Sequence, residues 1–370
     1  MTKFAVTSDF WRGKRVFVTG HTGFKGGWLV QWLSDLGAIC RGFALAPETK
    51  PAMFELLNAH ELCEHVIGDV RDAGAVSEAL TSFRPDIVIH MAAQPLVRRS
   101  YREPAATFDT NVMGTVNVLE ACRRAETLGA VVVVTTDKCY VNNEWDYGYR
   151  EADALGGKDP YSASKACTEI VTHAYRQSFF ADDSPIARVL PTASGRAGNV
   201  FGGGDYSEDR LIPDAIRAFS AGEPLVLRSP DAVRPWQHCL EPLSGYLELA
   251  RACYEGGAAF AKAYNFGPAP DQLLTVRDIA DALRAEWGDG AEWRHEPGEA
   301  HLKEAKLLLL DPGLAQRELS WSPQIAFTDA IRATGDWYRA AHDGASADEM
   351  RLLTSRQIAE LLGPQSEPAP

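Results

Sequence analysis

The sequence predicts an α/β protein with a doubly wound, parallel, Rossmann-type sheet and a smaller mixed α/β lobe. Strand-like apolar runs alternate with amphipathic helical stretches through about residue 190, the order that gives a parallel sheet covered by helices. A glycine-rich turn joins the first strand to the first helix. With 370 residues, 45% of them hydrophobic, the chain can bury a large core in one big or two unequal domains. We expect strands near 15–19, 38–44, 64–68, 86–90, 130–135 and 186–190.

The first strand and the turn after it predict a dinucleotide site. Lys14–Thr19 has the pattern of a short buried strand, and Gly20-x-x-Gly23-x-x-Gly26 leads into the helical stretch Trp28–Leu36. Glycines there let the backbone approach a pyrophosphate, whose charge is favoured at a helix N-terminus. The spacing differs from the usual Gly-x-Gly-x-x-Gly, and an ordinary glycine turn is the alternative. We expect cofactor contacts from Gly20, Thr22, Gly23, Phe24, Lys25 and Gly26.

Later strand ends should face the same cofactor, because the carboxyl ends of parallel strands share one edge of the sheet. Asp69 and Val70 follow the third strand, and Asp69 could accept a hydrogen bond from an adenine amino group. An ordinary turn carboxylate is the alternative for Asp69. The small Ala92 and Ala93 follow the fourth strand and would let the backbone lie against a ribose, while Thr135 follows the fifth.

Two segments bring proton-handling side chains towards one pocket. Thr135-Thr136-Asp137-Lys138-Cys139-Tyr140 directly follows an apolar run, and Tyr161-Ser-Ala-Ser-Lys165 comes next along the chain. A tyrosine four residues before a lysine shares its helix face, and the cation favours the phenolate. Such a tyrosine can take a hydroxyl proton while the carbinol hydrogen leaves as hydride. A solvated amphipathic pair is the alternative for Tyr161 and Lys165.

These motifs resemble the extended short-chain dehydrogenase/reductase family, through the glycine turn, Asp69, Ala92-Ala93-Gln94 after a strand, and Tyr161-x-x-x-Lys165. A denser set, from about Phe10 to Tyr338, resembles the CDP-glucose 4,6-dehydratases. Its motifs are Phe10–Trp28, Thr136–Tyr140, Gly148–Glu151, Arg196–Val200, Gly202–Asp205, Asp209–Asp214 and Arg234–His238.

The resemblance implies a lyase that converts CDP-D-glucose to CDP-4-dehydro-6-deoxy-D-glucose and water, with bound NAD reduced and reoxidised in each turnover. It implies that Tyr161 removes the O4 proton as the C4 hydride goes to NAD, and that Lys165 lowers the tyrosine pKa and holds the nicotinamide ribose. A base then removes the acidified C5 proton, water leaves from C6 and the hydride returns to C6. Thr136 would bond to the O4 region, and Asp137 would be the acid at the C6 hydroxyl.

Lys138 is the point at which the sequence departs from related enzymes. Dehydratases acting on dTDP-glucose have an Asp-Glu pair here, with glutamate as the base, whereas this chain has Asp137-Lys138. A lysine is a base only if burial lowers its pKa, and an adjacent carboxylate raises it. Lys138 is therefore either the neutral amine that removes the C5 proton, which we favour, or an ammonium that stabilises the C4 enolate. An ion-pair partner of Asp137 is the third interpretation.

The second predicted strand leaves the choice between NAD and NADP open. A carboxylate about 20 residues beyond the glycines usually binds the ribose 2′-hydroxyl. The strand Ala38–Leu45 ends without one, and Arg41 is its only charge, which favours NADP. The first step needs an oxidised cofactor and the resemblance implies NAD, so we expect NAD.

The predicted substrate side is rich in loops. Asn199 and the backbone amides of Gly198–Asp205 could contact a diphosphate, and the guanidinium groups of Arg210 and Arg234 suit phosphate oxygens. Surface salt bridges are the alternative for both arginines. Trp236 and His238 could line the sugar or base pocket, although core packing is equally compatible with them, and Gln94 and Tyr246 carry the same ambiguity.

We expect three segments: an NAD-binding Rossmann domain over 10–190, to which later segments return; a mainly substrate-binding lobe over 191–340; and a C-terminal helix and mobile tail over 341–370. The helix should span Ala347–Leu362 with Ser346 as its cap, followed by the tail Pro364–Pro370. The helices around Ala105–Ala125 and Ser162–Phe179 resemble those that pair in family dimers. A homodimer is therefore expected, with a tetramer open.

Charge and cysteine content narrow the other partners. A net charge of −13 disfavours nucleic acid and anionic membranes. The seven cysteines show no Cys-x-x-Cys pair, which fits reduced thiols in a cytoplasmic protein and no metal site, and no long apolar span is present. A nucleotide-sugar 4-epimerase, which has no need of the Asp137-Lys138 pair, and a non-catalytic dinucleotide-binding regulatory protein are the alternative functions.

Overall fold

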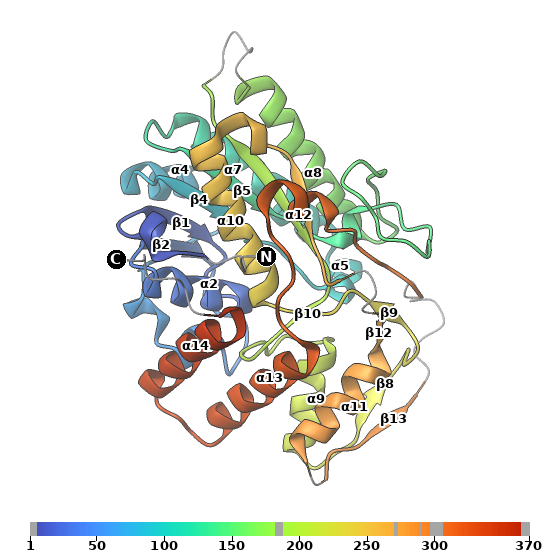
Figure 1. Cartoon of the computed structure of the whole chain (residues 1–370). Coiled ribbons are helices and arrows are strands. Elements are labelled where there is room, and N and C mark those ends of the chain that lie inside the picture. Colours follow the sequence, from blue (N-terminus) through green and yellow to red (C-terminus); the bar gives the residue numbers. More distant parts are fainter. Residues whose placement is uncertain (1–5, 182–187, 270–272, 289, 297–305, 364–370) are drawn as a thin grey trace.

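A seven-stranded sheet forms the centre of the protein in the computed structural model, which describes residues 6–181, 188–269, 273–288, 290–296 and 306–363. The sheet and its covering helices fill the upper part of Figure 1, and a smaller lobe lies below and to the right. The strand order is β11-β6-β5-β4-β1-β2-β3, and all neighbours are parallel. The strands are β1 (Arg15–Thr19), β2 (Ile39–Ala44), β3 (Glu64–Ile67), β4 (Ile87–His90), β5 (Ala130–Val134), β6 (Thr192–Ala197) and β11 (Ala263–Phe266).

This order confirms the predicted doubly wound sheet. The chain reverses direction across the sheet between β1 and β4, and ligands of such sheets bind beyond the carboxyl ends of the strands at that point. The glycine turn follows β1, and Ala92 and Ala93 follow β4. Both predicted cofactor segments therefore lie at the switch point.

Alternate residues of the strands pack into two cores on opposite faces of the sheet. Val132 of β5 belongs to one core and Val133 to the other. The first core contains α2 (Phe24–Asp35) and α10 (Leu240–Gly256), and the second contains α4 (Ala73–Phe83) and α7 (Gly114–Arg124). Because both faces are covered, β5 has an unbroken apolar sequence.

The remaining described elements complete the helical layers and the lobe. The other helices are α1 (Ser8–Trp11), α3 (Met53–Leu56), η1 (Ala59–Glu61), α5 (Val97–Arg102), α6 (Pro104–Phe108), η2 (Asp109–Met113), η3 (Asp137–Cys139), α8 (Pro160–Phe179), α9 (Leu211–Ser220), η4 (Gly257–Phe260), α11 (Val276–Trp287), α12 (Gly313–Leu319), α13 (Phe327–His342) and α14 (Ala347–Leu362). Short strand pairs are formed by β7 (Val200–Phe201) with β10 (Gln237–His238), β8 (Leu225–Leu227) with β13 (Trp293–His295), and β9 (Val233–Arg234) with β12 (Leu274–Thr275).

The sixth predicted strand is wrong in its position. We expected it at 186–190, but β6 spans Thr192–Ala197, and residues 188–190 belong to no strand. β6 consists mostly of small residues, and at Gly195 the close packing of Tyr246 leaves no room for a side chain. The prediction was misplaced because residues 186–190 are more hydrophobic than Thr192–Ala197 and match the pattern of a buried strand better.

The C-terminal helix is confirmed with the predicted limits. α14 spans Ala347–Leu362, and Ser346 caps it in a box in which Glu349 reaches back to the Ser346 amide. The predicted tail, 364–370, lies outside the described residues.

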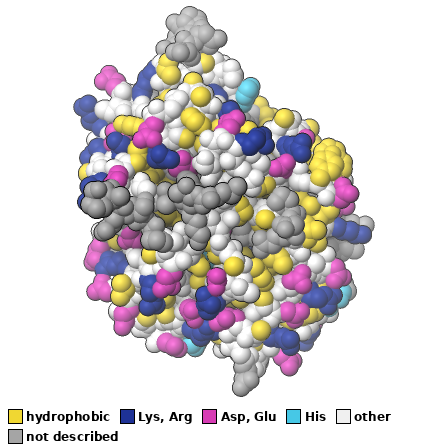
Figure 2. Space-filling view, viewed as in Figure 1, with side chains coloured by type: hydrophobic (Ala, Val, Ile, Leu, Met, Phe, Trp, Pro, Cys, Tyr) yellow, Lys and Arg dark blue, Asp and Glu magenta, His cyan; other side chains and the backbone are white. Residues whose placement is uncertain are grey.

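Acidic and basic side chains are interspersed over the face shown in Figure 2, without a continuous basic surface among the side chains drawn there in colour. All seven cysteines are free thiols. Across the described ranges, no helix combines the length and the apolar character that crossing a membrane requires.

Candidate active site

The turn between β1 and α2 fits only glycine at two positions. Gly20 has a φ of +77°, and a Cβ there would lie 2.8 Å from the backbone nitrogen of Ala92. A Cβ on Gly26 would lie 2.2 Å from the carbonyl oxygen of Gly20. Gly23, the N-cap of α2, has no side chain with which to cap the first amides of the helix. The turn, the start of α2 and the end of β4 therefore lie close together. The backbone amides at the start of α2 can bind a dinucleotide pyrophosphate there.

The other predicted cofactor residues lie along the same edge but have protein partners here. The Thr22 hydroxyl donates to the carbonyl of Leu45 at 2.9 Å. Asp69 forms an ion pair with Arg71 at 2.5 Å, and this hydrogen-bonded partner lowers the pKa of Asp69. Val70 is buried after β3. The predicted adenine contact of Asp69 therefore stays a prediction.

Lys25 extends from the glycine turn into the deeper part of the site. Its Nζ lies 5.4 Å from the ring centre of Tyr246. Burial, followed by repulsion from Lys165 and Arg210, lowers the pKa of Lys25 to about 7. The sequence predicted Lys25 only as a cofactor contact, whereas the structure places it within the electrostatic reach of candidate catalytic and substrate residues.

The segment after β5 carries three candidate catalytic groups in one short turn. Thr136 is the N-cap of η3, and its hydroxyl donates to Asp137 Oδ1 at 2.9 Å. Lys138 Nζ lies 3.2 Å from the same oxygen and 3.0 Å from Asn199 Oδ1. Asp137 is fully buried, whereas the Lys138 side chain is 26% exposed. The turn therefore presents an acid and an amine side by side, with the amine nearer to solvent.

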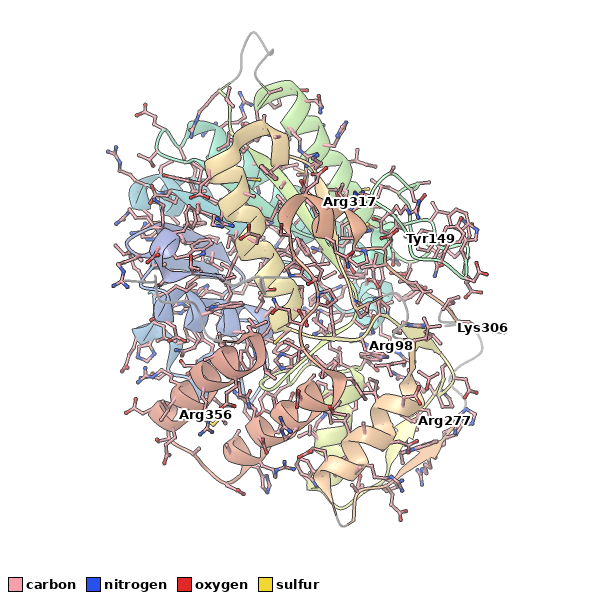
Figure 3. The ribbon with its side chains drawn as sticks, in the orientation of Figure 1. Arg98, Tyr149, Arg277, Lys306, Arg317 and Arg356 are labelled. Carbon is pink, nitrogen blue, oxygen red and sulfur yellow. The ribbon has the colours of Figure 1, made fainter. Side chains whose placement is uncertain are left out.

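The loop after η3 closes back over its start. Tyr149, labelled in Figure 3, stacks on Tyr140 with ring centres 5.3 Å apart, and both rings are buried. This stacking holds the loop after η3 against the turn that carries the candidate residues.

Helix α8 delivers the tyrosine and the lysine to this turn. Asp159 caps the helix by accepting from the Ser162 amide at 2.9 Å, and Pro160 occupies its first position. Tyr161 is therefore near the start of α8, where its amide donates to Ser100 of α5 at 3.1 Å. One turn later, Lys165 Nζ donates to the carbonyl of Val134 at 3.1 Å. The predicted grouping of Tyr161, Lys165 and the 135–140 segment is present.

The expected direction of the Tyr161 pKa is wrong for this structure. Burial raises the pKa of Tyr161 to about 12, although a hydrogen bond with the Thr136 side chain works in the opposite direction. Burial also lowers the pKa of Lys165 to about 8. The sequence argument considered only the attraction between the two groups, whereas burial favours the neutral form of each.

Two predicted substrate residues lie beside these groups. Asn199 is bound to Lys138, and Arg210 forms an ion pair with Asp205 at 2.8 Å. Burial dominates the raised pKa of Tyr161, and the positive charge of Arg210 is among the smaller influences that oppose it. Arg234 donates to the carbonyl of Val233 at 2.8 Å and is buried.

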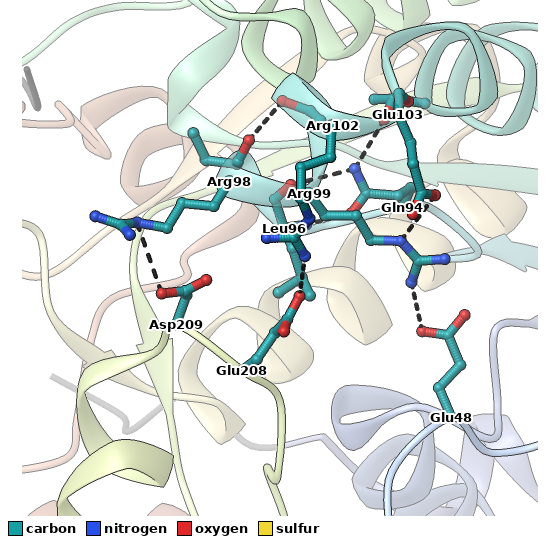
Figure 4. A network of polar contacts seen from close by, with 12 residues as sticks. Glu48, Gln94, Leu96, Arg98, Arg99, Arg102, Glu103, Glu208 and Asp209 are labelled. Carbon is teal, nitrogen blue, oxygen red and sulfur yellow. Dashed lines mark hydrogen bonds and ion pairs between the residues drawn. The ribbon is translucent and has the colours of Figure 1, made fainter. Parts of the chain in front are cut away.

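Three other predicted substrate residues are buried in this structure. The ring of His238 packs nearly perpendicular to the rings of Trp28 and Phe201, and Trp236 is also buried. Gln94 donates to Thr107 at 2.9 Å and accepts from the Leu96 amide at 2.6 Å, which orders the loop before α5 (Figure 4). Their contacts with substrate stay predictions.

Helix α5 carries charged residues that the sequence analysis did not select. Figure 4 shows its arginines reaching acids in other segments. Arg98 lies 3.6 Å from Asp209, and Arg102 lies 2.5 Å from Glu208. Both acids directly precede Arg210, so these ion pairs connect α5 to the candidate substrate loop. The run of arginines in Val97–Arg102 was the available signal.

The family model, two similar sequences and one similar solved structure described below are all named as 4,6-dehydratases of sugar nucleotides. The family model described as GDP-mannose 4,6 dehydratase matches residues 17–334. The chain is 46% identical over 357 residues to a CDP-glucose 4,6-dehydratase of Salmonella typhimurium, covering 96% of this chain and 98% of that protein. It is 29% identical over 303 residues to a dTDP-glucose 4,6-dehydratase of Shigella flexneri, covering 74% and 77% of the two chains. A dTDP-glucose 4,6-dehydratase from Streptomyces venezuelae, solved with NAD and TYD bound, superimposes with a TM-score of 0.74 at 26% identity, covering 89% of this chain and 98% of that one.

Proposed function

The chain belongs to the GDP-mannose 4,6 dehydratase family, and from this premise we propose that it converts CDP-D-glucose to CDP-4-dehydro-6-deoxy-D-glucose and water. NAD is reduced and reoxidised within each turnover, so the reaction is redox-neutral overall. The enzyme is therefore a hydro-lyase that depends on NAD. The base preference for cytosine is supported by the 46% identity to the Salmonella enzyme over nearly the full length of both chains.

One observation supports dehydration as the type of reaction. Asp137 and Lys138 lie side by side in the site that also contains Tyr161. Loss of water across C5 and C6 needs an acid at the leaving hydroxyl and a base for the C5 proton, and a cation nearby can stabilise the C4 enolate that forms. Oxidation at C4 needs only a proton acceptor such as Tyr161. The site contains groups for both tasks.

The glycine turn and the strand ends fit NAD. Gly20–Gly26 would hold the pyrophosphate, Asp69 the adenine side, and Lys165 the nicotinamide ribose. Bound NAD supplies the hydride acceptor at C4 and the donor at C6. Arg41, which favoured NADP in the sequence, binds Glu64 at 2.5 Å and the Ser82 hydroxyl at 2.7 Å. Its guanidinium is thereby committed to the protein, which supports NAD.

The side chains divide the proton transfers among them. Tyr161 accepts the proton of the C4 hydroxyl in its phenolate form, which the Lys165 ammonium and the oxidised cofactor would have to favour against the effect of burial, and Thr136 orients that oxygen. Asp137 protonates the C6 hydroxyl as water leaves. Lys138 acts at C5 as the amine that takes the proton. If it acts instead as the ammonium that stabilises the enolate, the Asp137 carboxylate has to take the C5 proton before it protonates the leaving hydroxyl. Arg210, Arg234 and Asn199 bind the diphosphate.

A nucleotide-sugar 4-epimerase is the alternative function. The chain resembles a UDP-glucose 4-epimerase from Thermotoga maritima with a TM-score of 0.76 at 20% identity, which shows a shared fold. Epimerisation would use Tyr161 and Lys165 but has no use for Asp137 and Lys138. A non-catalytic dinucleotide-binding protein would have no use for any of the four.

Purified protein should be incubated with CDP-glucose, UDP-glucose, dTDP-glucose and GDP-mannose separately, and the products identified by mass. We expect CDP-glucose alone to lose the mass of one water. An isomer of unchanged mass would replace the proposal with epimerisation, and no conversion of any sugar nucleotide would favour the binding protein. Dehydration of a different sugar nucleotide would keep the reaction and overturn the base preference.

We also propose a cytoplasmic homodimer, with a tetramer as the alternative. Exposed apolar side chains gather on the helices expected to pair: Phe108 is 37% exposed, Met113 47% and Ile170 56%. Covering them would remove apolar surface from water. Light scattering should give twice the monomer mass for the wild type. Ile170→Asp should lower the measured mass towards that of the monomer, and a monomeric wild type would contradict the proposal.

The seven free thiols support a reducing compartment, as expected for a cytoplasmic protein.

A further inference from the structure

A buried ion pair lies directly behind the candidate catalytic segment. Glu169 of α8 and Arg196 of β6 are joined at 2.8 Å, and their side chains are 3% and 4% exposed. Removing two charges from water costs about as much as their attraction returns, so a buried pair contributes little net stability by itself. Its value to the protein therefore depends on what else the two side chains contact.

Glu169 holds the start of the catalytic segment. One of its oxygens accepts from the Thr135 hydroxyl, directly after β5. The other accepts from the Ser194 hydroxyl and from Arg196, both at 2.8 Å. Glu169 also lies one helical turn after Lys165, and its negative charge raises the pKa of that lysine against the effect of burial.

Arg196 holds the end of the same segment. Its second terminal nitrogen donates to the Tyr140 hydroxyl at 2.7 Å and to the Glu151 carbonyl at 3.2 Å. The guanidinium carbon lies 5.0 Å from the centre of the Tyr140 ring. The Tyr140 hydroxyl in turn donates to Asn265 of β11 at 2.7 Å, which connects the contact to the edge of the sheet.

We propose that Glu169 and Arg196 are positioning residues for the dehydration: together they fix both ends of the segment that carries Thr136, Asp137 and Lys138. Thr135 and Tyr140 bracket these three groups, and each is bonded to one member of the ion pair. Neither positioning residue is placed to contact the sugar. The inference rests on the proposed function for its kinetic consequence, but its structural consequence can be measured without substrate.

The test uses the full-length protein with two variants. Glu169→Gln keeps the size and one oxygen acceptor but removes the charge. Glu169→Gln combined with Arg196→Met removes both charges, which avoids leaving one buried charge unpaired if the single variant fails to fold. Glu248→Gln is the control for removing a carboxylate from an ion pair elsewhere, because Glu248 is buried and pairs at 2.5 Å within α10 with Arg251, whose side chain is partly exposed.

The substrate-free measurement is hydrogen exchange at the amides of residues 136–140. We expect faster exchange there in the double variant than in the wild type or in Glu248→Gln. Unchanged exchange in a folded double variant would overturn the positioning role, whether or not the protein proves to be a dehydratase.

The kinetic measurement is the pH profile of product formation. We expect kcat to fall by between about tenfold and 100-fold with little change in KM, since misplacement of the acid and amine affects the reacting geometry. We also expect the alkaline limb to move to lower pH, because Lys165 loses the anion that favours its charged form. A wild-type kcat and profile in the folded variants would overturn the inference. Absence of any dehydration by the wild type would instead overturn the proposed function and leave the exchange result to decide the positioning role.

Discussion

The amine of Lys138 is shared between two acceptors that come from distant parts of the chain. Asp137 Oδ1 lies 3.2 Å away and Asn199 Oδ1 lies 3.0 Å away. Binding of a sugar between Lys138 and Asn199 would replace one of these contacts at the position where C5 chemistry is proposed.

Lys138→Met removes the amine and separates oxidation from elimination. We expect the variant, given CDP-glucose, to accumulate enzyme-bound NADH and to release no 4-keto-6-deoxy product, because Tyr161 can still act at C4 while C5 lacks its base or cation. Absorbance of bound NADH and product mass report the two steps. Lys158→Met, at an exposed lysine beyond the turn, is the control. Full activity of Lys138→Met would eliminate both proposed roles.

Tyr161→Phe removes the proton acceptor at C4 and stops the reaction one step earlier. We expect product formation to fall by about 10²- to 10⁴-fold, the usual contribution of a positioned acid or base. Bound NADH should not accumulate, which distinguishes this variant from Lys138→Met. Tyr147→Phe, at a tyrosine that is 52% exposed, should behave as the wild type. Retained turnover in Tyr161→Phe would assign the proton transfer to another group.

At the scale of elements, the β1–α2 turn should be the least tolerant part of the cofactor site. Gly26→Ala would place a methyl group 2.2 Å from the Gly20 carbonyl oxygen, so the turn must open. We expect destabilisation of about 1–3 kcal/mol and weaker NAD binding, measured by denaturant unfolding and titration calorimetry.

Gly74→Ala is the matched control for the turn variant, because its methyl group would meet only the Asp72 side chain, at 3.3 Å, on α4. We expect unchanged NAD binding in Gly74→Ala. Equal NAD affinity in both glycine variants would show that the tight turn is not needed for the cofactor.

At the scale of the whole molecule, buried titratable groups predict loss of stability in mild acid. Burial lowers the pKa values of His21, His90 and His238 to about 3, below the value of 6.5 expected in the unfolded chain. Between these values the unfolded chain binds more protons, so their contribution is present above pH 6.5 and is lost as the pH falls. Glu241 acts in the opposite direction, because burial raises its pKa from 4.5 to about 7.

Lys25 adds to the loss, because burial lowers its pKa from 10.5 to about 7 and the unfolded chain therefore binds more protons in this range. Together the three histidines and Lys25 outweigh one glutamate. We expect the free energy of unfolding to fall by roughly 3 kcal/mol between about pH 7.5 and about pH 5.5, as measured by urea denaturation. Glu241→Gln should steepen the loss, since the glutamine keeps an oxygen acceptor for the amides of Gln324 and Ile325 but removes the opposing titration. Greater stability of the wild type at the lower pH would contradict this account.

The sequence by itself determined the features that depend on residues close together in the chain. The strand–glycine turn–helix unit, the first five strands, the α14 cap at Ser346, and the placing of Tyr161 and Lys165 on one helix face all follow from local periodicity, turn chemistry and spacing. The sequence did not predict the full set of contacts in the site. The motifs and the resemblance to a known family did identify the side chains that the structure brings together there.

Only the tertiary structure decided which distant residues meet and how deeply each is buried. It moved the sixth strand to Thr192–Ala197, bound Arg41 to Glu64, and joined Lys138 to Asn199 across 61 positions of sequence. It also reversed the expected direction of the Tyr161 pKa. The physical reason is common to all of these: long-range contacts and desolvation are set by the packing of the sheet and its helices, and neither is encoded in the spacing of a single segment.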